Sequence, residues 1–209
     1  MHSNILKLCL SFLIVFFSFS SFNVANAQSI DPLGNIYITK KSGDLSNCGP
    51  IAALMLSKFS KRGALSKNLM GNIQYARRSI QKNPNSNRWW SIRDIKKYFT
   101  QEGIKHRLIT SRSRDTIKNQ LDKKSAVVIN VNMNNLSRGK SIGKPYFTFP
   151  FPGGWGHFLV IVGYKQMGGK LMYEVHDSFI KGGNNRLYDA DEIQFALQHY
   201  NPEILVVQR

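Results

Sequence analysis

The chain has 209 residues, and its 29 basic and 12 acidic side chains give a formal net charge of +17. This length suits one ordinary domain with a core of its own. The charge attracts anionic partners, but the basic residues are spread along the chain and form no nucleic-acid motif and no base-stacking aromatic pattern. We therefore expect no specific nucleic-acid binding, and a generally basic surface is favoured over a dedicated polyanion site.

The first 27 residues have the pattern of a secretory signal peptide. Lys7 is the only charged side chain there, Leu8 to Phe19 is almost wholly apolar, and Ala25-Asn26-Ala27 is a small-x-small cleavage site. The alternative is a retained membrane anchor, but the run is shorter than the ~20 apolar residues of a spanning helix. We expect a secreted or periplasmic protein with a mature domain of residues 28–209 and no stable membrane span after cleavage.

Apolar patterns along the mature chain predict helices first and then an antiparallel sheet, which is the α+β class. The leading part, 28–47, is polar and turn-rich. In chain order, we expect a short strand at 35–39, helices at 48–62, 65–82 and 92–102, a strand at 104–110, a helix at 113–121, strands at 126–131, 158–164 and 171–176, a helix at 189–199 and a strand at 204–207. A long loop is expected over 134–155, and a Gly-Gly hairpin turn at 168–169. No repeats or interdomain linkers are visible.

Cys48 is the first candidate for chemistry. It stands in Asn47-Cys48-Gly49-Pro50 at the start of a nearly all-apolar helix, where the helix dipole favours the reactive thiolate. After leader cleavage it is the one remaining cysteine, so no internal disulfide is possible and the secreted chain keeps a free thiol. The alternative is a small buried cysteine that only packs.

A thiol nucleophile needs a base and a group that orients the base. His157 follows a glycine-rich loop and opens an apolar strand, which makes it the best base. His176 is the rival because it adjoins Asp177, but alternation along a strand points those two side chains to opposite faces. In an antiparallel hairpin, His157 near the start of one strand can lie close to Asp177 at the end of the next. Taken singly, each residue could be a satisfied loop or turn residue.

Three segments together resemble a known family. They are Asn47-Cys48-Gly49-Pro50-Ile51-Ala52-Ala53-Leu54, Gly156-His157-Phe158-Leu159-Val160-Ile161-Val162-Gly163-Tyr164 and Tyr173-Glu174-Val175-His176-Asp177-Ser178. The chain resembles the papain-like cysteine peptidases that process double-glycine leader peptides of bacteriocins, and their stand-alone secreted relatives. The resemblance covers most of the mature chain. It implies a papain-like fold with Cys48 as nucleophile, His157 as base and Asp177 as orienting carboxylate.

The chain departs from the family at the oxyanion site. The resemblance implies a Gln six residues before the cysteine, and position 42 is Ser; the Asp usually found before the cysteine is Asn47. The backbone N–H of Cys48 can still donate, and Asn47, Ser46 or Ser42 are candidates for a second donor. Losing one such donor typically costs about 10²–10³ in rate.

Several residues are candidates for the substrate cleft. They flank the expected nucleophile and base, or are aromatic: Gly49, Trp155, Gly156, Trp89 and Trp90. The aromatic loop 146–152 is a further candidate. Core packing is an equally good interpretation for the loop and a better one for the tryptophan pair.

Two hypotheses of different classes follow. The first is a secreted or periplasmic thiol hydrolase, most simply a cysteine peptidase acting on a peptide or protein, with acyl transfer to an amine as a variant. The second is a catalytically weak papain-like domain that binds a peptide or cell-wall ligand. A third, a polyanion binder in which Cys48 is incidental, predicts salt-sensitive binding. We expect no cofactor and no metal, since no metal-ligand cluster or nucleotide loop is visible.

Overall fold

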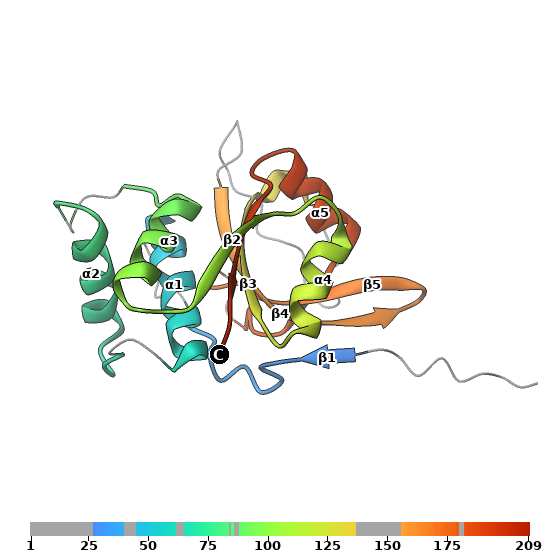
Figure 1. The fold of residues 1–209 in the computed structure, drawn as a ribbon, viewed down its shortest axis with the longest axis horizontal. Helices are drawn as coiled ribbons and strands as arrows, with labels where there is room; N and C mark the ends of the chain where they lie inside the picture. Colours follow the sequence, from blue (N-terminus) through green and yellow to red (C-terminus); the bar gives the residue numbers. More distant parts are fainter. Residues whose placement is uncertain are drawn as a thin grey trace, which may run out of the picture.

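A computed structural model of the chain describes residues 27–39, 45–61, 65–83, 85, 88–136, 156–179 and 182–209 (Figure 1). The leader predicted at 1–27 lies outside the described residues except for Ala27. The predicted loop 134–155 lies outside them from residue 137 onward, as does the predicted aromatic loop at 146–152. Within the described ranges, no helix is long and apolar enough to cross a membrane.

One antiparallel sheet forms the centre of the fold. Its strands are β1 (Ala27–Ser29), β2 (His106–Thr110), β3 (Ala126–Asn132), β4 (Gly156–Met167), β5 (Lys170–His176), β6 (Arg186–Asp189) and β7 (Glu203–Val207). Their order is β2-β7-β3-β4-β5-β6, and β1 pairs with the second half of β4. Every one of these pairings is antiparallel. The C-terminal strand β7 lies inside the sheet, between β2 and β3.

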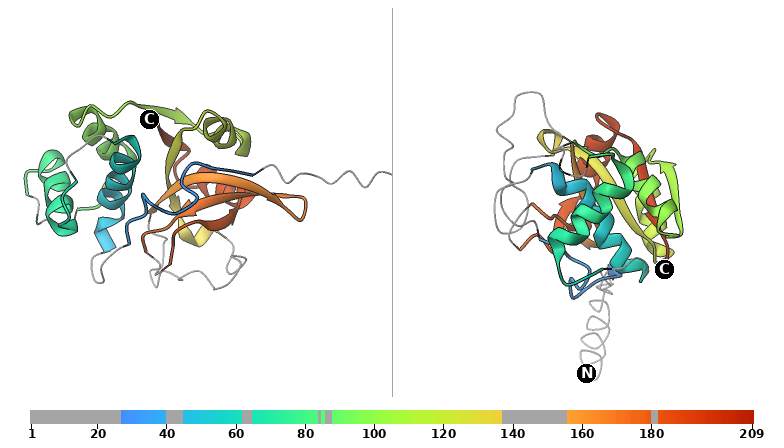
Figure 2. Two further views of the ribbon diagram at one scale, coloured as in Figure 1. Left: turned by 90° about the horizontal axis from the view of Figure 1, so that it is seen from below. Right: turned by 90° about the vertical axis from the view of Figure 1, so that its left-hand side faces the viewer.

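Helices cover both faces of the sheet (Figures 1 and 2). Their bounds are α1 (Cys48–Ser60), α2 (Leu69–Ile80), α3 (Ile92–Gln101), α4 (Arg114–Asp122) and α5 (Ala190–Gln198); short 3₁₀ turns η1 (Leu45–Asn47) and η2 (Met133–Asn135) precede α1 and follow β3. One core joins α1, α2 and α3 to one face, and the other joins α4 and α5 to the opposite face. Successive side chains of β3 and β4 point alternately into the two cores, because side chains along a strand alternate between the two faces of the sheet.

The α1 helix is the buried centre of the first core. Twelve of its thirteen residues are buried, and only Lys58 is exposed. A helix that is apolar on all sides is stable only inside a core, and α1 lies between the sheet and the other two helices of its layer. The helix ends at Lys61, which takes the left-handed conformation. Residue 62, the predicted end of this helix, lies outside the described residues.

The structure confirms the α+β class and the predicted order of helices and sheet. The α3 helix begins with a full capping box formed by Ser91 and Asp94, and the predicted hairpin turn has Gly168 and Gly169 at positive φ. The predicted strand at 35–39 is wrong. Its backbone is instead turned around Asp31, whose carboxylate accepts hydrogen bonds from the backbone N–H groups of Asn35 and Ile36. The strands β1 and β6, both short, were not predicted.

Candidate functional site

Cys48 is the first residue of α1 and is 2% exposed. Its sulfur is a free thiol. The next residue, Gly49, lies against two aromatic side chains: a methyl group there would come within 2.7 Å of Trp90 Cβ and 3.3 Å of the Phe158 ring. Glycine is therefore required for α3's leading segment and β4 to pack this closely on the start of α1. The thiol is held at a fixed point between the helical layer and the sheet.

His157 lies one residue inside β4, in register with Val131 of β3. Asp177 follows β5 directly, after His176 has paired with Val160 of β4. The antiparallel strands thus bring the two side chains together, and His157 Nε2 lies 2.8 Å from Asp177 Oδ1. Both side chains are 1% exposed. A charge-assisted hydrogen bond this far from water is strong, because little solvent screens it.

The Asp177 carboxylate is held by two further donors. The backbone N–H of Phe179 donates to Oδ1 at 2.9 Å, and the Tyr188 hydroxyl donates to Oδ2 at 3.0 Å. Burial raises the pKa of Asp177, but the positive charge and hydrogen bond of His157 and these two donors outweigh burial and hold the pKa below its usual range. The Phe179 ring meets the His157 ring edge-on at 4.8 Å between centroids.

His157 interacts with both of the other groups. Burial alone lowers its pKa, but the charge and hydrogen bond of Asp177, together with the hydrogen bond and charge of Cys48, raise the pKa to about 9. Because Asp177 occupies Nε2, the nitrogen left to face the thiol is Nδ1. The structure thus brings together a thiol, an imidazole and a carboxylate from α1, β4 and the end of β5. This arrangement can deliver a thiolate to a carbonyl carbon and a proton to a leaving group.

Comparison with known proteins identifies the family of the chain. The model of the Peptidase C39-like family matches residues 33–202. The chain belongs to the Peptidase C39-like family. Among solved structures, a presumed C39-like peptidase from Bacillus anthracis has a TM-score of 0.55 and 14% identity, covering 88% of this chain and 98% of the other. That likeness shows the shared fold. No curated protein matches the chain.

The rival histidine of this C39-like chain serves the N-terminal segment instead. His176 Nε2 lies 2.8 Å from Asp31 Oδ2, and His176 Nδ1 accepts a hydrogen bond from the Asn185 backbone N–H. Its Nε2 therefore carries the proton. Burial lowers the pKa of His176 and outweighs the carboxylate of Asp31. This pair fixes the turn at residues 31–36 onto the end of β5, and it lies outside the cluster of Cys48.

Two of the predicted oxyanion candidates contact a buried arginine. Arg77 of α2, which is 3% exposed, donates through Nε and Nη2 to Asn47 Oδ1 at 3.0 and 2.6 Å, and through Nη2 to Ser46 Oγ at 2.7 Å. The guanidinium thus holds the 3₁₀ turn that leads into Cys48. It also fixes the orientation of the Asn47 amide, because only the oxygen can accept from Arg77. The third candidate, Ser42, lies outside the described residues.

The predicted cleft residues divide into three groups. Gly49 and Gly156 lie next to the thiol and the imidazole in sequence. Trp90 is 4% exposed and packs in the first core against Tyr98, so it is a core residue beside the start of α1. Trp89 is partly buried. Trp155 lies outside the described residues.

The role of Arg77 was not predicted from the sequence, although Arg77 shares the apolar face of α2 with Ile73. No signal marked Phe179 or Tyr188.

Proposed function

We propose that the protein is a cysteine peptidase in which Cys48 is the nucleophile, His157 the general base and acid, and Asp177 the orienting carboxylate. The observation that carries the proposal is the buried pair of His157 and Asp177 at 2.8 Å, with the Cys48 thiol interacting with the same imidazole. Membership of the Peptidase C39-like family supports a peptide as the substrate. A thiol that only packs would not need an ionisable pair buried beside it.

The reaction follows from these positions. The Cys48 thiol gives its proton to His157, and the sulfur forms a bond to the carbonyl carbon of the substrate while the carbonyl electron pair moves to oxygen. When the carbonyl re-forms, the C–N bond breaks and His157 gives its proton to the departing amine. Water then attacks the thioester while His157 takes a proton from the water. The C–S bond breaks to release the acid, and His157 returns its proton to the sulfur, which restores the thiol. Asp177 holds the imidazole in the orientation that both proton transfers need.

The hydrogen-bond donors for the oxyanion are the part of the proposed site that departs from the family pattern. Its donors in this proposal are the backbone N–H of Cys48, at the positive end of α1, and the Asn47 side-chain amide that Arg77 orients. Because the family's usual glutamine is replaced by Ser42, we expect slower turnover than in a relative that has it. The same substitution favours a second candidate function, a domain that binds a peptide or cell-wall ligand in the cleft and turns it over poorly.

We also propose that the protein acts outside the cytosol, after cleavage of the leader at Ala27. Its positive charge suits an anionic surface or polymer there. One described hollow, of about 410 Å³, is lined by three basic side chains together with Thr100 and Leu108: Arg93, Lys96 and Lys97. Salt-dependent binding of the mature protein to an anionic polymer, unchanged by Cys48→Ser, would support this part of the proposal.

The test of peptidase activity uses residues 28–209 and a mixture of peptides whose cleavage is followed by mass spectrometry. We expect cleavage that is lost in Cys48→Ser and in His157→Ala, while both variants keep the wild-type circular dichroism spectrum. Cleavage that persists in Cys48→Ser would refute the assignment of the nucleophile. Binding of the same peptides without cleavage would favour the second candidate function.

A further inference from the structure

Asn130 carries a buried polar atom that the rest of the described chain leaves without a partner. The residue lies on β3 and is 8% exposed, and no donor in the described ranges bonds to its Oδ1. A buried amide oxygen without a hydrogen bond costs stability, and a core position on a central strand is ordinarily filled by an apolar side chain. The flanking residues Ile129 and Val131 follow that rule.

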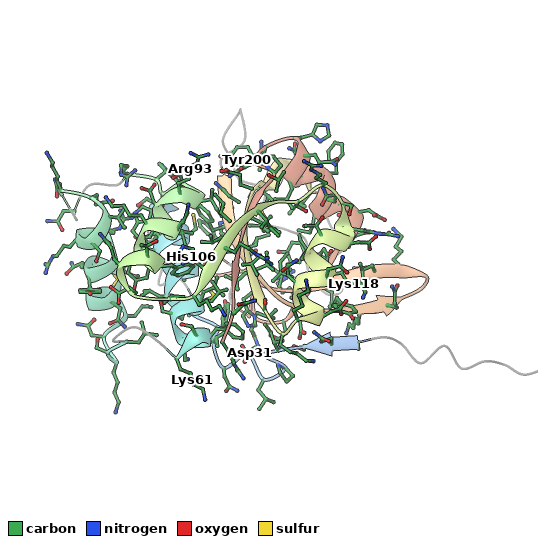
Figure 3. The ribbon with its side chains drawn as sticks, viewed as in Figure 1. Asp31, Lys61, Arg93, His106, Lys118 and Tyr200 are labelled. Carbon is green, nitrogen blue, oxygen red and sulfur yellow. The ribbon has the colours of Figure 1, made fainter. Side chains whose placement is uncertain are left out.

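The position of Asn130 relates it to the catalytic cluster. Asn130 pairs in register with Phe158, which packs against Gly49 beside the nucleophile. A methyl group at Gly156 would come within 2.8 Å of Asn130 Oδ1 and would collide with the Tyr200 hydroxyl. Two polar groups therefore converge at Gly156, the residue immediately before His157. Tyr200 is 44% exposed and lies at the upper end of the view in Figure 3, the end at which β4 begins in Figure 1.

This is the side on which a leaving group departs. In the proposed mechanism His157 protonates the leaving amine, so the part of the substrate that follows the cleaved bond begins beside His157 and, in this proposal, continues around the start of β4 past Gly156. That part of a peptide offers backbone N–H donors, which an unpaired amide oxygen accepts. The unsatisfied oxygen of Asn130 is satisfied when such a donor is bound.

We propose that Asn130, with the hydroxyl of Tyr200, forms a polar subsite that binds the peptide backbone on the leaving-group side of the cleaved bond. The proposal rests on the proposed peptidase function and specifies that this subsite binds the half of the substrate that follows the cleaved bond. It makes the protein an enzyme for internal peptide bonds, which continue past the cleaved bond, in preference to amides of small amines.

The test compares two substrates made from one peptide that the wild-type protein cleaves. The first is the whole peptide, and the second ends at the cleaved bond with 4-nitroaniline as leaving group. Asn130→Leu keeps the size of the side chain and removes its hydrogen-bonding atoms. We expect this variant to lower kcat/KM about tenfold for the whole peptide, the effect of one lost hydrogen bond, and to change the value for the anilide less than twofold.

The stability of the same variant separates a binding role from a structural one. If the buried oxygen serves a ligand, Asn130→Leu raises the Tm of the free protein by ~2–8 °C, because an unsatisfied polar group is removed. Tyr200→Phe should lower kcat/KM for the whole peptide severalfold. Tyr75→Phe, which removes the hydroxyl of another half-exposed tyrosine whose partner is Glu102, is the matched control and should leave it unchanged.

Each outcome bears on the proposal. Equal losses for the two substrates, or a lower Tm with both activities unchanged, would show that Asn130 is structural and would overturn the subsite. Activity toward the anilide that depends on Cys48 establishes the peptidase function independently of Asn130. If the wild-type protein cleaves no peptide, the peptidase function fails and the subsite fails with it.

Discussion

Replacing Asp177 with Asn tests the charged state of the central pair. The variant is nearly the same size as the wild type but removes the negative charge that, together with the interactions of Cys48, raises the pKa of His157 against the effect of burial. The pKa of about 9 lies about 2.5 above the ordinary 6.5, so the surroundings of the protonated imidazole, in which Asp177 is the main favourable partner, stabilise the fold by on the order of 3 kcal/mol. For a domain of this size, we expect Asp177→Asn to lower the Tm at pH 6 by ~6–12 °C.

The sign of the pH dependence follows from the direction of the shift. Because the pKa of His157 is raised on folding, its contribution is complete below about pH 6.5 and is lost as the pH rises through about 9. The lowered pKa of Asp177 places the loss of its own contribution at acidic pH. The Tm difference between wild type and Asp177→Asn should therefore shrink by at least half between pH 6 and pH 9.5, as measured by thermal unfolding across that range.

The second buried His–Asp pair supplies the control. Burial lowers the pKa of His176 beside Asp31, so that imidazole is already neutral above pH 6.5 and its contribution is lost only as the pH falls. The Tm difference produced by Asp31→Asn should stay level between pH 6.5 and 9. An Asp177→Asn difference that is equally level would refute the charged state that we assign to His157.

Two further substitutions test the packing around the nucleophile. Arg77→Met removes the hydrogen bonds to the two residues before the nucleophile and should lower the free energy of unfolding, measured in urea, by about 2–4 kcal/mol. The control Arg78→Met, on the exposed face of the same helix, should change this free energy by less than about 0.5 kcal/mol. Equal effects of the two substitutions would contradict the role of Arg77. Gly49→Ala places a methyl group within 2.7 Å of Trp90 Cβ and should cost about 1–3 kcal/mol by the same measurement, so an unchanged stability would show that the two elements are not tightly packed.

The parts of the fold that sequence could predict have local signals. The start of α1 follows from Pro50 and an apolar run, and the start of α3 follows from Ser91, a typical N-cap residue before an apolar pattern. The single free cysteine and the histidine at the start of an apolar strand marked Cys48 and His157 as candidates, and the expected hairpin predicted that Asp177 lies near His157. These inferences depend on spacing within one element or one hairpin.

The remaining parts depend on contacts distant in sequence. Arg77 resembles one of many solvated basic residues until α2 packs beside η1, 30 residues earlier. The segment 35–39 has a strand-like composition, but Asp31 and His176, 145 residues apart, hold it in a turn. Asn130 interrupts an apolar strand, and its position beside Gly156 is set by the pairing of β3 with β4. No local pattern encodes such pairings.

The pH dependence of Cys48 alkylation by iodoacetamide tests the central claim most directly. Residues 28–209 are compared with the same protein carrying His157→Ala. An activated pair predicts a wild-type rate at pH 6 close to that at pH 8, and a variant whose rate falls about tenfold per pH unit below pH 8, as for an ordinary thiol. A wild-type profile that already falls in this way, and that the substitution leaves unchanged, would contradict the assignment of Cys48 and His157 as a catalytic pair.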